Sequence, residues 1–460
     1  MQNKKHTKAK EQTAAPGGYK GRITAYRALH RVLHGGAFSN IVLGNALDDE
    51  SLAPGDRRTA TFLVLGVLRN LALLDAVFRS KTSKGKITAA PALLLAARMA
   101  IFEILFQNKI PKYATISEYM KIAAAECSKS ETKFLNACLR RVSHKDMHRL
   151  LEDAETDLRR MALEFSCPEW FAQSAVKFYG KDDTLKMLRA NNLGMPSYFR
   201  TNPLRVSADE LSDMYARQRV DAAFSKRLPN CVYFKAGQGY HPVREVRAGL
   251  LTPQDFSTQI VAHAVAPQPG DSVLDLCCGR GAKATHLAEL MGNRGRVLAC
   301  DIHAHKTEIA AGEAERLGVS ILETRVCDAT VPGDLGFFDR VLVDAPCTGT
   351  GTFRRRPELK QRVRPAQVME LAFLQRRMLE AAARLVAPGG RLVYATCSVL
   401  PEENDDVAAE FLERHEDFAP ARAVPALERL PQFKTPFGSV FLPQHTQACG
   451  SAVYILDRKS

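Results

Sequence analysis

The spacing of hydrophobic residues changes along the chain, and the change predicts two kinds of structure. From residue 21 to about 150, apolar residues recur at helical spacing, as at Ala25, Leu29 and Val32. The same spacing marks the segments 62–68, 93–106 and 134–139. Gly and Pro residues separate these segments, so we expect a compact all-helical bundle with its own core.

From about residue 246 to 460, short β-branched runs alternate with helical stretches. The predicted strands are 273–276, 296–300, 321–326, 340–343 and 391–395. Strand–helix alternation on this spacing predicts a doubly wound parallel sheet, which is a Rossmann-like α/β domain. The last apolar segments, 440–442 and 452–456, are expected to form a closing hairpin.

The segment between these regions, 151–245, has mixed signals and predicts a small mixed α/β subdomain. Ser166–Trp170 predicts an amphipathic helix that is entered through a proline. Tyr198–Asn202 and Cys231–Lys235 predict short strands with aromatic and basic side chains. Such side chains either stack on bases and bind the phosphates of RNA, or pack in the subdomain core. The sequence leaves both alternatives open.

Charge and length narrow the class of partner. The 460 residues are enough for two or three domains, and the net charge of +14 favours a polyanion, most often nucleic acid. A basic enzyme that does not bind nucleic acid would carry the same charge. Residues 1–20 hold five lysines and one glutamate and are expected to form a disordered basic tail.

The sequence disfavours zinc-binding, disulfide-rich, membrane-spanning and secreted proteins. The eleven cysteines include no Cys-x-x-Cys pair, so we expect neither zinc nor a disulfide framework. The apolar stretch 92–106 contains Arg98 and Glu103, which makes it too short and too charged to span a bilayer. The first 20 residues do not resemble a signal peptide. We therefore expect a cytoplasmic monomer without bound metal.

Two cysteines lie directly after predicted strands. Cys347 stands in Asp344-Ala-Pro-Cys-Thr-Gly-Thr-Gly, after the strand 340–343. Cys397 stands in Thr-Cys-Ser, after the strand 391–395, and the motif Pro401-Glu-Glu-Asn follows it. In open α/β sheets ligands bind at the carboxyl ends of the strands. Two thiols in one crevice indicate covalent catalysis, in which one cysteine attacks and the other helps to release the product.

A nucleotide site is indicated between the first predicted strand and its helix. In Asp275-Leu-Cys-Cys-Gly-Arg-Gly-Ala-Lys the small residues allow a ligand to approach the backbone, and a helix N-terminus follows. Asp301 closes the second strand, where an acid can bind both ribose hydroxyls. Asp328 lies near the end of the third strand, where it can accept from an adenine amino group. An adenosine ligand is expected; NAD is the rival, but G-x-G-x-x-G is absent, as is a P-loop.

On these motifs, residues from about 150 to 456 resemble the Nol/Nop/Sun family of RNA 5-methylcytosine methyltransferases. The N-terminal segment is similar to the NusB helical RNA-binding domain, on the residues Gly36–Asn40, Gly66–Asn70 and Phe134–Ala137. The resemblance implies an AdoMet-dependent methyltransferase domain preceded by a NusB-like bundle and a small RNA-binding subdomain. A NusB-like bundle in this place implies the bacterial Sun type, whose substrate is one cytosine of 16S rRNA.

The resemblance also implies roles for residues. Cys397 would attack the base, Cys347 would assist product release and Asp344 would hold the base, whereas DNA cytosine-5 methyltransferases use Pro-Cys to attack. The expected AdoMet contacts are Cys277, Cys278, Gly279, Arg280, Gly281, Ala282, Lys283, Asp301, Asp328 and Asp344. The family usually has D-x-C-A-A-P-G-G-K-T in the first loop. This chain departs from that pattern at Cys278, Gly279, Arg280, Ala282 and Ala284.

A basic run follows the Cys347 loop directly. Arg354, Arg355, Arg356 and Lys360 are the expected RNA contacts, and the run 354–364 has a net charge of +5. The alternative is a solvated helix face. Two rival functions stay open at this stage: a non-catalytic RNA-binding or ribosome-assembly factor, and a DNA cytosine-5 methyltransferase.

Overall fold

The computed structural model describes residues 18–49, 51–82, 90–107, 110–236, 240–421 and 424–460. Contacts within the chain divide it into two compact units, Met1–Ser166 and Cys167–Ser460. Residues 1–17, most of the predicted tail, lie outside the described residues. The first helix begins at Tyr19, within the last two residues assigned to that tail.

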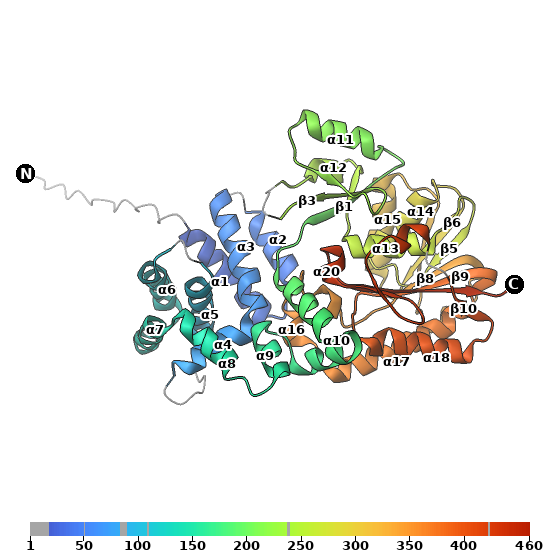
Figure 1. Cartoon of the computed structure of the whole chain (residues 1–460). Helices are drawn as coiled ribbons and strands as arrows, with labels where there is room; N and C mark the ends of the chain where they lie inside the picture. The colour runs from blue at the N-terminus through green and yellow to red at the C-terminus, as the bar shows by residue number, and fades with distance from the viewer. Residues whose placement is uncertain (1–17, 50, 83–89, 108–109, 237–239, 422–423) are drawn as a thin grey trace, which may run out of the picture. The chain divides into compact units, whose positions relative to one another are not determined.

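The first unit is helical throughout its described residues, as expected (Figure 1). Its helices are α1 (Tyr19–Leu33), α2 (Ser39–Leu47), α3 (Pro54–Arg69), α4 (Leu71–Ser80), α5 (Pro91–Phe106), α6 (Lys112–Glu126), α7 (Lys129–Arg141), α8 (His144–Glu152) and α9 (Asp157–Glu164). The periodic apolar residues of α1, Ala25, Leu29 and Val32, are all buried in its core. Helix periodicity thus identified the core-facing side of this helix correctly.

Helix α5 contacts α1, α3, α4, α6 and α7, and it is apolar on all sides. Its two charges have partners: Glu103 accepts two hydrogen bonds from Arg22 at 2.7 and 2.8 Å, and Arg98 donates to Asp75 at 2.7 Å. Such pairing is what allows charges to be buried. Among the described helices no single one is long and apolar enough to cross a membrane; α3 and α4 pass that test only together, bent by 77°.

The second unit begins with a helix and a small antiparallel sheet. Its elements are α10 (Glu169–Asn192), β1 (Ser197–Thr201), α11 (Ala208–Arg217), β2 (Ala223–Phe224), β3 (Cys231–Phe234), α12 (Val243–Arg247) and β4 (Leu251–Pro253), in the strand order β2-β3-β1-β4. Strand β4 pairs with β1 and lies beyond residue 245, so this sheet extends past the segment 151–245. Phe199 and Phe234 meet edge to face, with ring centroids 5.6 Å apart, in the core of this subdomain.

The rest of the second unit is an α/β structure built on a larger, mixed sheet. Its elements are α13 (Phe256–Val265), β5 (Ser272–Asp275), α14 (Ala282–Leu290), β6 (Arg296–Asp301), α15 (Ala304–Leu317), β7 (Leu322–Val326), β8 (Phe338–Asp344), η1 (Thr350–Thr352), α16 (Leu359–Arg362), α17 (Pro365–Ala383), β9 (Val386–Thr396), η2 (Pro401–Glu403), α18 (Asp405–Arg414), β10 (Phe418–Pro420), α19 (Pro425–Glu428), β11 (Phe433–Lys434), β12 (Ser439–Phe441), α20 (Pro443–Thr446) and β13 (Ser451–Arg458). The strand order is β11-β12-β13-β9-β8-β5-β6-β7, and β10 pairs with β13. The predicted closing hairpin is β12 and β13, which pair antiparallel.

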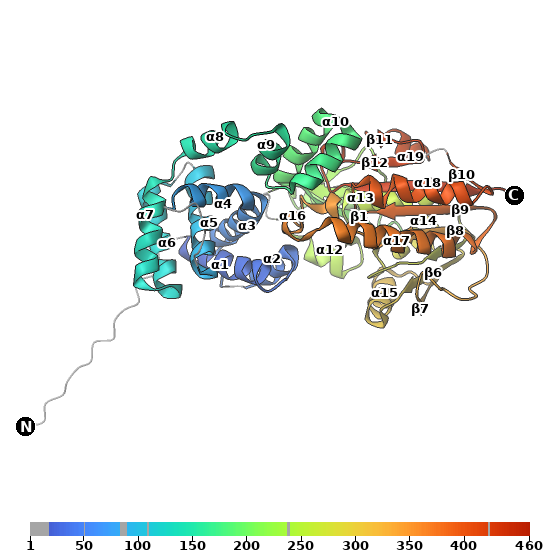
Figure 2. The ribbon, with the colours of Figure 1, turned by 90° about the horizontal axis from the view of Figure 1, so that it is seen from below.

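Helices cover both faces of this sheet. Helices α13, α14 and α15 lie on one face, and α17 and α18 lie on the other (Figures 1 and 2). Alternate side chains of β9 serve the two faces: Val393 and Ala395 join the core under α13 and α14, whereas Leu392 and Tyr394 are buried but lie outside that core. This doubly wound arrangement confirms the predicted fold class.

The topology places the site. Strands β6 and β7 extend the sheet on one side of β5, and the parallel strands β8 and β9 extend it on the other. The chain therefore changes direction between β5 and β8. A crevice outside the carboxyl ends of the strands at such a switch point is where open α/β sheets bind ligands.

Candidate active site

The two cysteines of interest lie side by side at the carboxyl ends of β8 and β9, next to this switch point. Cys347 follows β8 and Cys397 follows the neighbouring parallel strand β9, and their Sγ atoms are 3.1 Å apart. Both residues are partly exposed. Two neighbouring strands thus bring together residues that are 50 positions apart in the sequence.

The loops that carry the cysteines are packed directly on each other. The Gly351 amide donates to the Cys397 carbonyl oxygen at 2.9 Å. A Cβ atom at Gly351 would lie 2.7 Å from that oxygen and 2.4 Å from the carbonyl oxygen of Gly450, so no larger residue fits there. The hydroxyl groups of Thr350 and Ser398 add a hydrogen bond at 2.9 Å. The Thr-Gly-Thr-Gly motif after Cys347 therefore holds the Cys397 loop.

The motif Pro401–Asn404 forms hydrogen bonds with both cysteine loops. The Glu403 carboxylate accepts a hydrogen bond from the Thr348 amide at 2.8 Å, next to Cys347. The Asn404 side chain accepts from the Thr396 hydroxyl at 2.6 Å and donates to the Ser398 carbonyl oxygen at 3.1 Å, on either side of Cys397. These roles were not predicted. The motif itself was the available signal, because it follows the cysteine strand at a short distance.

The surroundings of the two thiols differ in charge. The hydrogen bond from Cys347 lowers the pKa of the Cys397 thiol, and the positive charges of Arg356 and Lys283 act in the same direction. The same hydrogen bond, together with burial and the negative charge of Glu403, raises the pKa of the Cys347 thiol. The pKa of Cys397 is therefore shifted down and that of Cys347 up, so that of the two thiols Cys397 loses its proton more readily.

Two acids and a lysine lie close together near the cysteines. Asp344, at the end of β8, forms an ion pair with Lys283 in the first turn of α14. This pair raises the pKa of the Lys283 ammonium in spite of its burial. Burial raises the pKa of Asp275 to about 7, and the nearby Asp344 carboxylate contributes to the rise. The Asp275 Oδ1 atom accepts from the Cys277 amide at 3.2 Å, whereas Oδ2 is buried without a partner.

The first loop has the form that a nucleotide-like ligand needs. Gly279 and Gly281 have φ angles of +55° and +81°, and a Cβ atom at Gly279 would meet nothing within 4 Å, so the space beside it is open. The Gly279 amide donates to Asp301 at 3.1 Å. The Asp301 carboxylate at the end of β6 thus faces the loop, and it also accepts from the His303 amide at 2.9 Å and pairs with Lys306 at 3.3 Å. The open space beside Gly279 allows a ligand to approach the backbone of this loop.

The other predicted cofactor residues are placed as follows. Cys278 is buried, and Cys277 and Ala282 are partly exposed. Arg280 is exposed and makes no hydrogen bond or ion pair with any described residue. Asp328 is exposed just beyond β7, where it accepts from the Thr330 amide at 2.8 Å. Cys277, Cys278 and Arg280 lie on the loop after β5, Ala282 begins α14, and Asp328 lies on the loop after β7.

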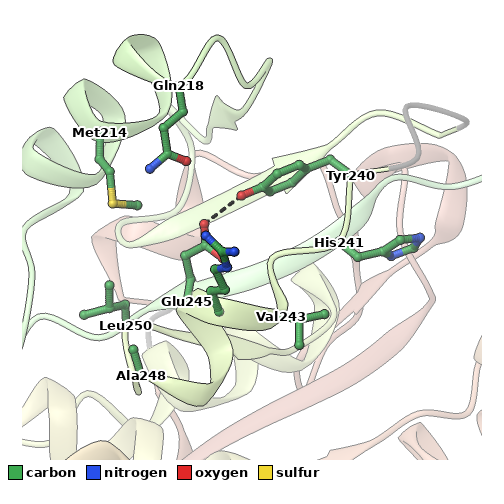
Figure 3. A pocket seen from close by; sticks show the side chains of 9 residues that line it. Met214, Gln218, Tyr240, His241, Val243, Glu245, Ala248 and Leu250 are labelled. Carbon is green, nitrogen blue, oxygen red and sulfur yellow. Dashed lines mark hydrogen bonds between the residues drawn. The ribbon is translucent and has the colours of Figure 1, made fainter. Parts of the chain in front are cut away.

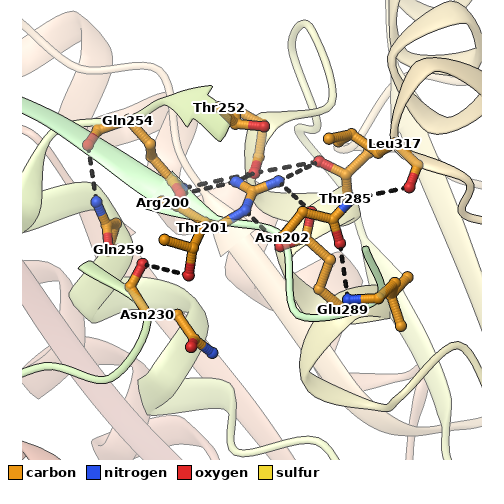
Figure 4. Close-up of polar contacts among 12 residues, drawn as sticks. Arg200, Thr201, Asn202, Asn230, Thr252, Gln254, Gln259, Thr285, Glu289 and Leu317 are labelled. Atoms are coloured by element: carbon orange, nitrogen blue, oxygen red, sulfur yellow. Dashed lines mark hydrogen bonds and ion pairs between the residues drawn. The ribbon is translucent and has the colours of Figure 1, made fainter. Parts of the chain in front are cut away.

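Arg200 anchors the cofactor helix instead of binding RNA. It is 1% exposed at the end of β1, and it donates to both carboxylate oxygens of Glu289 in α14, at 2.6 and 2.9 Å. It also donates to Gln254, to the Ala282 carbonyl oxygen and to the Thr285 hydroxyl, at 2.8 to 3.0 Å (Figure 4). The suggestion that basic residues of this strand bind phosphates is therefore wrong for Arg200, because its charge is neutralised inside the protein.

The basic run after η1 is also only partly at the surface. Lys360 is 1% exposed and donates to the Asn192 side chain at 2.6 Å, and Arg354 is 6% exposed and donates to the Gly194 carbonyl oxygen. These two predicted RNA contacts instead hold the end of α10, so their prediction is corrected. Arg355 is exposed, and Arg356 is partly exposed near Cys397. A run of like charges does not reveal which of its members point inward.

A separate pocket of about 530 Å³ lies in the small subdomain. It is lined by Met214, Gln218, Tyr240, His241, Val243, Arg244, Glu245, Ala248 and Leu250. The Tyr240 hydroxyl points toward Glu245 and donates to it at 2.7 Å (Figure 3). None of these residues belongs to the predicted site. Within the described part of the chain, no group of three or more His, Cys, Asp or Glu residues could hold a metal ion.

Comparison with known families gives three matches in chain order. The NusB family matches residues 20–144, a ferredoxin-like domain of RsmF/B-like methyltransferases matches residues 167–240, and the family described as 16S rRNA methyltransferase RsmB/F matches residues 262–450. The chain is 32% identical to the probable ribosomal RNA small subunit methyltransferase B of Bacillus subtilis, over 90% of this chain and 93% of that protein.

Solved structures share the fold. The crystal structure of PH0851 matches with a TM-score of 0.79 and 24% identity, over 97% of this chain and all of that chain. The structure of NSun6 from Pyrococcus horikoshii with SFG matches with a TM-score of 0.57 and 19% identity, over 64% of this chain and 98% of that chain. These matches agree with the helical bundle, the small subdomain and the doubly wound sheet described above.

Proposed function

The chain belongs to the family of AdoMet-dependent ribosomal RNA small subunit methyltransferases B, and from this premise we propose that it methylates carbon 5 of one cytosine in 16S rRNA through a covalent bond to Cys397. The observation that carries the proposal is the pair of sulfur atoms 3.1 Å apart at the switch point of the sheet, in which Cys397 is the more acidic thiol. Methyl transfer to a nitrogen or a ribose oxygen would need no such pair.

The first step is the addition of Cys397 to the base. Carbon 5 of cytosine is a poor nucleophile. When the Cys397 thiolate forms a bond to carbon 6, the electrons of the 5,6 double bond become available at carbon 5, which can then accept a methyl group. AdoMet supplies that methyl group when it is bound. Asp344 lies beside this crevice, where its carboxylate can accept a hydrogen bond from the cytosine amino group.

The second step is release of the product. The proton on carbon 5 leaves to water, the double bond forms again, and the bond between carbon 6 and sulfur breaks with its electron pair returning to Cys397. The Cys347 thiol, 3.1 Å from that sulfur, donates a hydrogen bond to the leaving thiolate. The raised pKa of Cys347 keeps it protonated and thus able to donate.

The donor site is assigned to the loops at the ends of β5, β6 and β7. Cys277 to Lys283 would lie along the ligand, Asp301 would bind the ribose hydroxyls and Asp328 the adenine amino group. The open space beside Gly279 and the unpartnered oxygen of Asp275 support this assignment. The changed residues of the first loop keep small side chains where the backbone comes close to the ligand, and Arg280 is directed to solvent.

The RNA must present an unstacked cytosine, because a base within a helix cannot reach a crevice at the edge of a sheet. Arg355 is exposed beside the cysteine loops and is the member of the basic run best placed for a phosphate. Residues of the run that are buried contribute to its geometry and not to its charge at the surface.

Methyl transfer to 16S rRNA tests the proposal. Purified protein with labelled AdoMet should modify small-subunit RNA at a single cytosine that bisulfite sequencing identifies as 5-methylcytosine. The same site should be unmodified in cells that lack the protein. Methylation of DNA in preference to RNA, or absence of AdoMet binding by calorimetry, would instead favour one of the two rival functions.

The cysteine roles are tested by two variants. Cys397→Ala should abolish turnover and any covalent RNA adduct, because no thiolate remains to attack carbon 6. Cys347→Ala should leave an adduct that survives denaturing gel electrophoresis, because release is slowed. If Cys347→Ala lost the adduct and Cys397→Ala trapped it, the two roles would be reversed.

A further inference from the structure

Glu403 is a buried carboxylate without an ion-pair partner among the described residues. Its side chain is 0% exposed at the end of η2. Across the residues that the structure describes, no lysine, arginine or histidine forms an ion pair with it. A buried charge of this kind is costly unless hydrogen bonds hold it, and its field is weakly screened. Its charge adds to the hydrogen bond with Cys397 and to burial in raising the pKa of the Cys347 thiol.

Neutral donors hold Glu403 against the Cys347 loop. The Thr348 amide donates to it at 2.8 Å and the Thr348 hydroxyl donates to the second oxygen, while Gln375 donates at 3.3 Å. Gln375 also donates to the Pro346 carbonyl oxygen at 2.9 Å. Thr348 is thus held by the Glu403 carboxylate, and Pro346, on the other side of Cys347, is held by the Gln375 side chain.

Charged groups around the thiols are unevenly distributed. Cys397 is under the influence of Lys283 from α14, Arg356 from the loop after η1 and Asp344 from β8. Cys347 is under the influence of Cys397 and of Glu403. Buried Tyr394 of β9 donates its hydroxyl hydrogen to the Glu403 backbone carbonyl at 2.6 Å and carries no charge. Cys449, after α20, is buried near Cys397 and Arg355.

We propose that Glu403 is a positioning residue for the cysteine pair: its buried carboxylate, held by the amide and hydroxyl of Thr348, places a negative charge beside the Cys347 loop and so favours attack by Cys397. The role of Glu403 in catalysis rests on the proposed function, in which Cys397 attacks the base. Without the charge of Glu403, the Cys347 thiol would lose its proton more readily, and less of the negative charge of the pair would stay on Cys397.

Alkylation of single cysteines tests this inference without RNA or AdoMet. Glu403→Gln is made in two backgrounds, Cys397→Ser and Cys347→Ser, and iodoacetamide labelling of the remaining thiol is followed by mass spectrometry between pH 6 and 10. In the Cys397→Ser background, Glu403→Gln should speed labelling of Cys347 at pH 8 about tenfold, which corresponds to a shift of about one pH unit in its midpoint. Labelling of Cys397 in the other background should not change.

Glu402→Gln is the matched control, because Glu402 lies on the same turn, is partly exposed and binds Ser174 at 3.1 Å. It should leave both labelling rates unchanged. Thr348→Val keeps the carboxylate but removes one of its donors, so Cys347 should stay slow to react. Unchanged labelling of Cys347 in Glu403→Gln overturns the inference.

Two further outcomes also overturn it: equal acceleration of both cysteines at every pH, and a Thr348→Val variant that reacts as fast as Glu403→Gln. Either would mean that loosening of the loop, and not the charge, governs the thiol. Because labelling needs no methyl transfer, failure of this inference is distinct from failure of the proposed function, which the RNA adduct of Cys397 tests separately.

Discussion

Single residues at the switch point combine burial with charge. Asp275, Lys283 and Asp344 lie near one another, and only the last two form an ion pair. Asp275 is fully buried, and one of its oxygens has no partner. A buried acid with an unpaired oxygen lowers the stability of the protein, and such groups occur mainly at functional sites.

Asp275→Asn should stabilise the protein at pH 8 and change its stability little at pH 4. Burial raises the pKa of Asp275 to about 7, above its value of roughly 3.9 in the unfolded chain. The native state therefore holds an extra proton between these values, so its stability falls as the pH rises from about 4 to 7 and stays lower above that. Thermal unfolding of the full chain at both pH values measures the effect.

Asp334→Asn is the control for that experiment, because Asp334 is exposed and its Oδ1 atom accepts a single hydrogen bond from the Gly336 amide. It should show no pH-dependent gain. An Asp275→Asn variant whose advantage is the same at pH 4 and pH 8 would show that the unfavourable charge of Asp275 is not the cause.

Some pairs of helices pack closely only because one residue at the contact has no side chain. Helices α3 and α5 approach each other at Gly66, where a Cβ atom would lie 2.0 Å from the Phe102 ring. The ring stacks on Phe106 at 5.1 Å between centroids and cannot move freely. The contact between α5 and α3 therefore needs glycine for its lack of a side chain and not for its backbone freedom.

Gly66→Ala should destabilise the helical unit by about 1–3 kcal/mol, the usual cost of overpacking a core. Gly44→Ala is the matched control, because a Cβ atom at this position of α2 would meet nothing within 4 Å. That variant should be neutral or slightly stabilising, since alanine favours helix over glycine. Urea unfolding of the two full-length variants compares them, and equal stability would contradict the packing argument.

Arg200 joins two elements, the end of β1 and the helix α14 that follows the first loop. Arg200→Met alone should destabilise the protein by about 3–5 kcal/mol, because it leaves the Glu289 carboxylate buried without a cation. The double variant Arg200→Met, Glu289→Leu should recover most of that loss. It should still bind AdoMet more weakly, because the Ala282 carbonyl oxygen at the start of α14 loses its donor.

Urea unfolding and calorimetric titration with AdoMet measure the two effects separately. A double variant no more stable than the single one would argue against the uncompensated charge as the cause. Unchanged AdoMet affinity in the double variant would show that the start of α14 keeps its geometry without Arg200.

The whole molecule carries a net charge of +14, which favours binding to a polyanion such as RNA. Each phosphate that a protein neutralises releases counterions, so RNA affinity depends on salt. We expect binding of small-subunit RNA to weaken steeply between 50 and 200 mM salt, as in other proteins that contact several phosphates.

Arg355→Ala should lower the slope of log affinity against log salt by about 1, as for the loss of one phosphate contact. Arg414→Ala is the control, because Arg414 is exposed on α18 but paired with Glu410 at 2.6 Å. Filter binding at several salt concentrations gives both slopes. If Arg355→Ala keeps the parental slope, Arg355 does not contact a phosphate.

The sequence by itself determined the elements and the place of the chemistry. Helical spacing at Ala25, Leu29 and Val32 and the β-branched runs around Val341 and Val393 are local patterns, and local patterns decide helix, strand and buried face. Because both cysteines follow parallel strands, their position at one edge of the sheet also followed from the sequence.

Only the tertiary structure decided how side chains are paired. Arg200 meets Glu289 89 residues away, Glu403 meets Thr348 55 residues away, and Lys360 meets Asn192 168 residues away. None of these pairs has a local signature, because each depends on which face of a strand or loop its residue occupies after folding. That is why the two thiols could be found in the sequence, whereas the charges that distinguish them could not.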